Sequence, residues 1–173
     1  MFKLEEFSVE KFDSILSKGL SHGLGNPDSQ VCIEAAICQT LGLPHGDDPG
    51  CVSVAVRYFK IKLNDSEWSS PAARAKGLRD LGIAQLGSKG VVDDYEFSKL
   101  VAEKTIRILV PKIFRLVFSD NEICLAAALR CEQEGTEAAA NAAYDARDEY
   151  LTLMAIIALD VLRELKSPGI ALL

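Results

Sequence analysis

The segment from Ser21 to Cys51 concentrates the side chains that could do chemistry, with both histidines and three of the five cysteines. Cys32 is predicted to lie in the first turn of a helix, where free amide groups and the positive end of the helix dipole stabilise a thiolate. A nucleophilic thiol also needs a base, for which His45 is available, and a carboxylate such as Asp47 to orient that base. These residue types suggest a Cys/His-dependent hydrolase or transferase.

The predicted spacing weakens this catalytic interpretation for Cys32. A helix of about twelve residues would place Cys32 roughly 15–20 Å from His45. Cys51 is a better neighbour, because it belongs to the same loop and helix start as His45. The glycines and prolines of this loop are equally typical of a plain corner between two helices. We therefore favour thiols packed in the core and histidines bonded to loop carbonyls, and keep the thiol enzyme as the alternative.

A second set of residues is predicted to bind a ligand or partner without covalent chemistry: His22, Asp48, Asn64, Asp65, Trp68, Arg74 and Arg79. Asn and Asp favour turns because their side chains bond nearby backbone amides. We interpret the single Trp mainly as an anchor over the core, with a binding hot spot as the other reading. The two arginines could pair with Asp47 or Asp48 and fix the loop, or face an anionic ligand. Gly77, between them on a helix, indicates close packing of another element.

The spacing of histidines and cysteines does not support a metal site. The cysteines follow C-x5-C and C-x6-C patterns, whereas zinc sites use paired spacings such as C-x2-C. The glycines between Gly19 and Gly25 follow no predicted strand and lack the Lys-Ser/Thr of a phosphate-binding loop. We therefore expect neither a metal nor a cofactor.

The elements that must position these side chains are predicted to be helices, with capping residues at their starts. The predicted helices begin after Ser8, after Asp28 or Ser29, after Asp48, after Ser70, after Asp93 and after Ser119, and the last runs over 137–165, with a kink expected at Pro111. Residues 51–63 also fit a strand, because Val52, Val54 and Val56 alternate. We choose a helix there, since a lone strand would leave its backbone groups without partners.

Composition limits the class of protein. The chain has 173 residues, of which 49% are hydrophobic and 25% are charged, and its net charge is −6. These values predict a single globular domain over 1–173. Together with the predicted helices, they indicate an all-α helical bundle of about six to eight helices with Gly/Pro-rich corners. No apolar run approaches the ~18 residues of a membrane span, and the acidic balance argues against nucleic acid. Five cysteines and an acidic start without a signal peptide predict free thiols in the cytoplasm.

Several linked motifs resemble a set of uncharacterised bacterial proteins. They are CIEAAI at 32–37 with GLPHGD at 42–47, LND at 63–65 with WSS at 68–70, IAQLGS at 83–88, and LRELKSPG at 162–169. The resemblance implies a bacterial or phage-related soluble protein and assigns no activity, cofactor or functional residue. The leading hypothesis rests on the absence of a complete catalytic set beside strong helical patterning. It is a non-enzymatic helical protein that binds a protein partner or itself, as a homodimer, through an apolar or alanine-rich helix face such as 138–143. A neighbouring helix of the same fold is the favoured partner of that alanine-rich run, and a second subunit is the alternative. A small ligand is the other partner considered.

Overall fold

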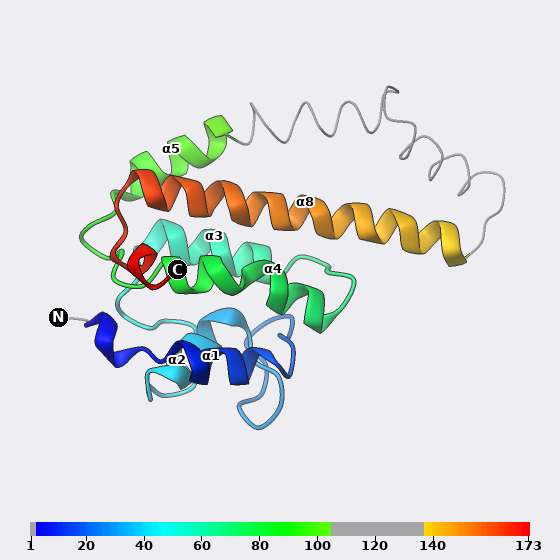
Figure 1. Ribbon diagram of the computed structural model, residues 1–173, viewed down its shortest axis with the longest axis horizontal. Helices are drawn as coiled ribbons and strands as arrows, with labels where there is room; N and C mark the ends of the chain where they lie inside the picture. Colours follow the sequence, from blue (N-terminus) through cyan, green and yellow to red (C-terminus); the bar gives the residue numbers. More distant parts are fainter. Residues whose placement is uncertain (1–2, 105–136) are drawn as a thin grey trace.

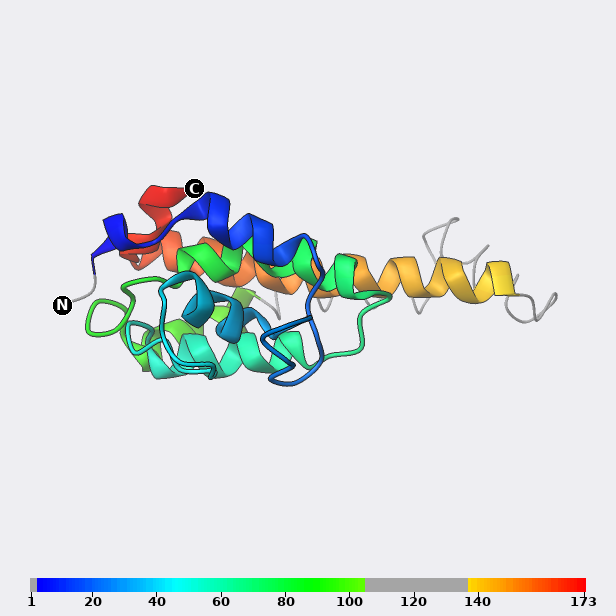
Figure 2. The ribbon, with the colours of Figure 1, turned by 90° about the horizontal axis from the view of Figure 1, so that it is seen from below.

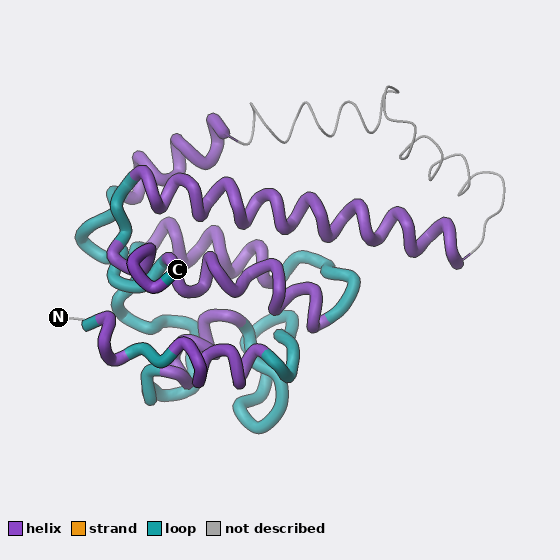
Figure 3. Tube along the Cα trace, viewed as in Figure 1, coloured by secondary structure: helices purple, strands orange, loops and turns teal. Residues whose placement is uncertain are grey.

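The computed structural model describes residues 3–104 and 137–173, without the side chains of Glu103 and 137–150. In these ranges the chain forms the elements η1 (Leu4–Glu6), α1 (Val9–Leu16), α2 (Ile33–Thr40), α3 (Val54–Asn64), α4 (Pro71–Ala84), α5 (Asp94–Lys104), α8 (Glu137–Glu164) and η3 (Pro168–Leu172). Isolated bridges join Val31 to Leu20 and Gly25, and no strand occurs among the described residues (Figure 3). The expected all-α class is confirmed for this part. The kink predicted at Pro111 and the helix start at Ser119 lie outside the described residues.

Three helices begin where their capping residues predict. Ser8 Oγ accepts a hydrogen bond from Lys11 N, and Ser70 Oγ accepts one from Ala73 N. At the start of α5, Asp93 Oδ1 accepts one from Glu96 N. Each bond satisfies an amide that has no partner within its own helix. These starts are set by local sequence alone.

The predicted start of the second helix is wrong, because α2 begins at Ile33 and not after Asp28 or Ser29. The backbone before Ile33 is bonded across its own loop: Ser21 N donates to Val31 O, Asn26 N to Gln30 O and Cys32 N to Leu24 O. Groups paired in this way cannot form helical hydrogen bonds. Gly25 makes the loop possible, because its φ is +75° and a Cβ there would lie 2.3 Å from Gln30 O.

The predicted start of the third helix is also wrong, because α3 begins at Val54 with Ser53 as its N-cap. Asp48 instead closes a small turn, in which Gly50 N donates to its carboxylate and Gly50 adopts a φ of +71°. The choice of a helix over a strand for 51–63 is right from Val54 onward. The alternation of valines is therefore a consequence of apolar content rather than of a β conformation.

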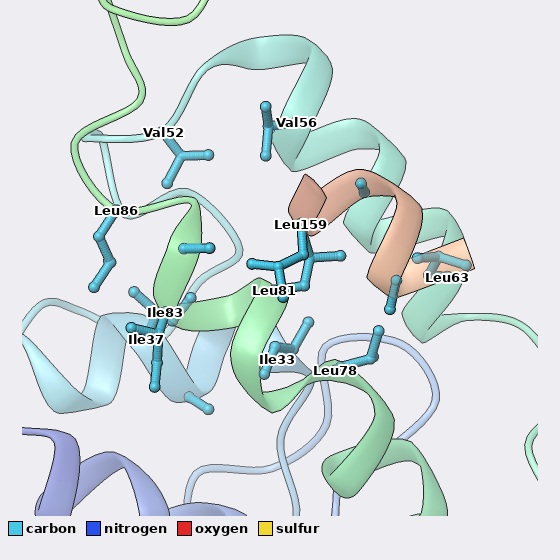
Figure 4. Close-up of a cluster of buried hydrophobic side chains, with 14 of the residues drawn as sticks. Ile33, Ile37, Val52, Val56, Leu63, Leu78, Leu81, Ile83, Leu86 and Leu159 are labelled. Carbon is cyan, nitrogen blue, oxygen red and sulfur yellow. The ribbon is translucent and has the colours of Figure 1, made fainter. Parts of the chain in front are cut away.

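Helix α4 lies at the centre of the described part and packs against α1, α2, α3 and α8. Helix α8 runs along α4 and α5, and its N-terminal half extends beyond α3 and α4 (Figures 1 and 2). The core between these helices is aliphatic: Ile33, Ile37, Val56, Leu63, Leu78, Leu81, Ile83 and Leu159 are among its buried residues (Figure 4). Burying one such side chain contributes about 1.5–3 kcal/mol to stability. The fold is held mainly by this shared interior.

Gly77 shows the close packing that the sequence predicts for it. A Cβ at Gly77 would lie 2.5 Å from Trp68 Cη2 and 3.3 Å from Thr152 Oγ1 of α8. Trp68 is 8% exposed, and its Nε1 donates a hydrogen bond to Leu63 O at 2.9 Å. Its position is that of an anchor between the α3–α4 loop and α4. The side chain is too deeply buried to serve as a surface hot spot in this conformation.

The C-terminal segment folds back on the end of α4, close to the N-terminal element η1 (Figure 1). Ser167 Oγ donates to Ala84 O at 2.7 Å, and Gly169 N donates to Leu86 O at 2.9 Å. Both acceptors belong to the end of α4 or the turn after it, so these bonds satisfy carbonyls that the helix leaves open. Within the described ranges, every helix is too short or too polar to cross a bilayer.

Candidate functional site

A small cavity between the start of α2 and the end of α3 gathers several of the residues predicted to act. It has a volume of about 40 Å³, and its polar lining consists of Cys32, Glu34, Asp47, Asn64 and Asp65. Cys32 and Asp47 come from the predicted catalytic set, and Asn64 and Asp65 come from the predicted binding set. The tertiary structure thus brings together residues that the sequence places in two separate groups.

Asn64 fixes the cavity by joining three segments of the chain. Its Oδ1 accepts a hydrogen bond from Ile33 N at 3.2 Å, and its Nδ2 donates to Ser21 O at 3.0 Å and to Asp65 Oδ1 at 2.9 Å. Asp65 Oδ1 also accepts from Gly23 N at 2.8 Å. The last turn of α3 therefore sets the position of the loop before α2, and with it the wall of the cavity.

One lining residue, Glu34, belongs to a buried ion pair. Lys60 Nζ is 3.0 Å from Glu34 Oε1, and both side chains are fully buried. Gln85 Nε2, from the C-terminal end of α4, donates to Glu34 Oε2 at 2.9 Å. Burial raises the pKa of Glu34 and lowers the pKa of Lys60, because it destabilises each charged form, while the attraction between the two charges opposes both shifts. The ion pair links α2 to α3, and the hydrogen bond from Gln85 links Glu34 to the end of α4.

Sequence reasoning missed this pair, although a signal for it exists. Glu34 stands in the otherwise apolar run IEAAIC, and Lys60 lies four residues after Val56 on the buried side of α3. A single charge at a position where the helical period predicts an apolar residue needs a partner in the core. Two such charges of opposite sign on neighbouring helices are therefore each other's expected partners.

The three described cysteines are free and buried. Cys32 is the N-cap of α2, and its sulfur accepts a hydrogen bond from Ala35 N at 3.3 Å. Burial raises the pKa of Cys32 and of Cys51, and it raises the pKa of Cys38 to about 11. The position at a helix start, which was expected to stabilise a thiolate at Cys32, is thus outweighed by desolvation. Cys124 and Cys131 lie outside the described residues.

The other members of the predicted catalytic set have partners of their own. His45 Nε2 lies 3.3 Å from Gly25 O, which matches the reading of a histidine bonded to a loop carbonyl. Asp47 and Asp48 both face Arg57, at 3.5 Å and 3.4 Å, and Arg57 also donates to Asp47 O. Within the described part, none of these bonds joins a candidate thiol, His45 or Asp47 to another member of the predicted catalytic set.

The predicted arginines bind other partners than expected. Arg79 forms two hydrogen bonds with the carboxylate of Asp13, at 2.6 Å and 2.8 Å, and these bonds hold the pKa of Asp13 below its usual value. Arg74 is 7% exposed and donates to Leu20 O at 2.7 Å. The carboxylates of Asp47 and Asp48 are instead bound by Arg57. Arg74 therefore binds a backbone carbonyl of the loop after α1 and not the loop that carries Asp47 and Asp48.

His22 is exposed, and the structure places it outside the cavity lining.

Alkylation of the native protein with iodoacetamide is expected to accelerate only above about pH 8.5. Burial raises the pKa of each described thiol, so the thiolate is scarce at neutral pH. The rate is measured for each cysteine by peptide mass spectrometry between pH 6 and 10, with the urea-unfolded chain as the control. A rate at Cys32 or Cys51 that reaches its plateau below about pH 7.5 would contradict this and would favour the thiol enzyme.

A second feature is an exposed apolar face at the starts of α3 and α5, which we define as Val54, Tyr58, Val91 and Tyr95. Their exposed fractions are 66%, 63%, 52% and 77%. The two segments are tied together: Asp94 Oδ1 accepts hydrogen bonds from Ser53 Oγ and Ala55 N, and Ser53 N donates to Ser88 Oγ. These large side chains therefore belong to one region of the surface.

A groove adjoins this apolar face at Val91. Its volume is about 860 Å³, and its lining includes Leu4, Leu41, Leu43, Cys51, Val91 and Pro168. The lining comes from η1, the loop after α2, the turn before α5 and the start of η3. The groove is predominantly apolar, with Lys89 and Glu6 as its charged members.

Comparison with protein-family models, curated protein sequences and solved structures finds no match to this chain. Among the described residues, no three His, Cys, Asp or Glu side chains are grouped so that they could hold a metal ion. The geometry of the groove and the apolar face is therefore the basis for the proposals below.

Proposed function

We propose that this protein is a non-enzymatic helical binding protein that associates with a second copy of itself through the apolar face. The observation that supports this proposal is the exposure of Val54, Tyr58 and Tyr95, three large side chains on two helices that are hydrogen-bonded at their starts. Val54 and Tyr58 are four residues apart on α3, so they lie on the same side of that helix. Contiguous exposed apolar side chains are typical of protein interaction sites, in which tyrosine is enriched.

Charge around the apolar face favours a second copy as the partner. Helix α3 carries Lys62 beside Tyr58, with its ammonium 5.4 Å from the ring centroid, whereas Asp93, Asp94 and Glu96 lie at the start of α5. In a two-fold symmetric dimer each contact between the protomers occurs twice. A dimer in which α3 of one protomer lies against α5 of the other therefore places Lys62 near these carboxylates twice. The adjoining groove would extend the contact beyond the four apolar side chains.

The alanine-rich run over 138–143 was the other face considered for self-association. It lies in α8, but its side chains are outside the described residues. The proposal therefore depends on the apolar face alone.

Size-exclusion chromatography with light scattering tests the proposal. We expect the mass to rise from about 19 toward 38 kDa as the concentration of the full chain rises to about 100 µM, as for a weak isologous dimer. Tyr58→Ser combined with Tyr95→Ser is expected to keep the chain monomeric, because these aromatic side chains are exposed and are the expected hot spots.

The matched control is Ile156→Ser, which removes a side chain that is 51% exposed on α8. It should leave the dimerisation constant unchanged. A strict monomer at the highest concentration, or equal weakening by the control, would overturn the proposal. Circular dichroism spectra that superimpose on that of the unmodified chain verify that each variant is folded.

A further inference from the structure

We infer that the groove beside the apolar face is part of the contact between two copies of this chain, and that Lys89 of each protomer pairs there with Glu6 of the other. This inference rests on the proposed self-association and adds to it the charged residues that orient the two copies. Three observations support it: the area that a dimer needs, the openness of the groove and the charges in its lining.

The apolar face alone is small for a dimer interface. Val54, Tyr58, Val91 and Tyr95 expose between 52% and 77% of their surfaces. Even if a partner covered them completely, they would contribute roughly 500 Å² per protomer, since a whole tyrosine presents about 150–250 Å². A standard interface buries about 800 Å² on each partner. Val91 also lines the groove, so the groove is the adjoining surface that can supply the remaining area.

The groove has room for a side chain of a second copy. Its volume is about 860 Å³, and several of its lining residues are glycine or proline, which place no long side chain in it. A Cβ at Gly50 or Gly90 would meet no atom of a more distant residue within 4 Å, so the groove is open at both positions. Leu43, which is 40% exposed, belongs to the same lining. In a two-fold symmetric dimer, Leu43 of each protomer can enter the groove of the other.

The charges of the groove are self-complementary. Its charged members are one cation, Lys89, and one anion, Glu6, and both are exposed. Neither forms an ion pair within the described part of the chain. A two-fold axis through the groove brings Lys89 of one protomer to Glu6 of the other, and symmetry repeats this pair. A ligand of a single sign would instead place a like charge beside one of the two residues, so the lining favours a second copy.

Charge reversal in the full chain tests this pairing. Lys89→Glu and Glu6→Lys each place like charges at both symmetric contacts. Each should therefore raise the dimer dissociation constant about fivefold or more at about 50 mM salt, where exposed charges are weakly screened. Sedimentation equilibrium measures the constant. An equimolar mixture of the two variants should return to within about twofold of the unmodified chain, because opposite signs then face each other at both contacts of the mixed dimer.

Lys76→Glu is the matched control, because it reverses an exposed lysine of α4 that lines neither the groove nor the apolar face. It should leave the dissociation constant unchanged. Native mass spectrometry counts mixed dimers when Glu6→Lys is labelled with 15N. Mixed dimers should form most of the dimers with Lys89→Glu, and no more than random pairing gives with Lys76→Glu. Circular dichroism spectra verify that these variants are folded.

The outcomes separate this inference from the proposed self-association. An unmodified chain that stays monomeric at about 100 µM overturns both. A chain that dimerises through Tyr58 and Tyr95, but whose dissociation constant is unchanged by both reversals, overturns the groove contact alone. Mixed dimers that are equally abundant with Lys89→Glu and with Lys76→Glu overturn the pairing of Lys89 with Glu6, because they would show attraction between net charges only.

Discussion

Lys60→Met is expected to lower the free energy of unfolding by about 3–5 kcal/mol, the largest effect of any single substitution considered. The methionine fills most of the volume of the lysine, so the loss does not come from a cavity. It comes from Glu34, whose fully buried carboxylate would keep only the hydrogen bond from Gln85. The measurement is urea unfolding followed by circular dichroism at pH 7. Lys62→Met is the matched control, because Lys62 is an exposed residue of the same helix.

The double variant Glu34→Gln/Lys60→Met separates charge from packing. It removes both charges and leaves an amide oxygen at position 34 to accept from Gln85 Nε2. Because the net contribution of a buried ion pair is small once desolvation is counted, at least half of the lost stability should return. A double variant that is less stable than Lys60→Met would show that the loss arises from packing instead of from the unpaired carboxylate.

The stability of Lys60→Met is also expected to depend on pH. Without Lys60, burial raises the pKa of Glu34 in the folded state above the unfolded value of about 4.3. The folded state then holds a proton that the unfolded state has lost, so stability falls as pH rises through this interval. The difference in the free energy of unfolding between the variant and the unmodified chain should therefore become smaller as the pH falls from 7 toward 5. A difference that stays constant over this range would exclude protonation of Glu34.

Gly77→Ala is expected to destabilise the protein by about 1–3 kcal/mol, although alanine is the better helix former by about 1 kcal/mol. The added methyl group would lie 2.5 Å from the Trp68 ring and 3.3 Å from Thr152 Oγ1. Since the ring is held on its other edge by its bond to Leu63 O, it has little freedom to move away. Thermal and urea unfolding both measure the change.

A double-mutant cycle with Trp68→Leu tests the cause. The smaller side chain removes the contact with position 77, so in this background Gly77→Ala should be neutral or stabilising, giving a coupling energy of about 1–3 kcal/mol. Gly46→Ala is the control, because a Cβ at Gly46 would meet only Pro44 O, at 3.9 Å. Additive effects of the two substitutions would contradict steric conflict with the indole as the cause.

Local sequence determines several elements of this protein. Ser8, Ser70 and Asp93 mark the starts of α1, α4 and α5, because an N-cap bond involves residues only two or three positions apart. Phe7, which precedes the N-cap Ser8, packs against Phe12 with a ring separation of 5.3 Å, as in a hydrophobic staple. Gly77 could also be interpreted from sequence, since a helical glycine without a compensating contact would only weaken its helix.

The starts of α2 and α3 depend on residues that are distant in the sequence. Asp28 and Asp48 are good capping residues, yet the helices begin at Ile33 and Val54. The α2 amide at Ile33 is bonded by Asn64, thirty-one positions away, and the α3 amide at Ala55 by Asp94, thirty-nine positions away. A capping residue competes with such distant acceptors, and the sequence alone does not reveal which acceptor is near.

What the sequence by itself determined is the helical class and the chemical types at its corners, including Cys32, Asp47, Asn64 and Asp65. Only the tertiary structure decided that these four side chains share one cavity. It also decided that Glu34, in the wall of that cavity, pairs with Lys60 and that burial raises the pKa of the thiols. The physical reason is range: helix propensity and capping act over a few residues, whereas desolvation and ion pairing depend on segments that only folding brings into contact.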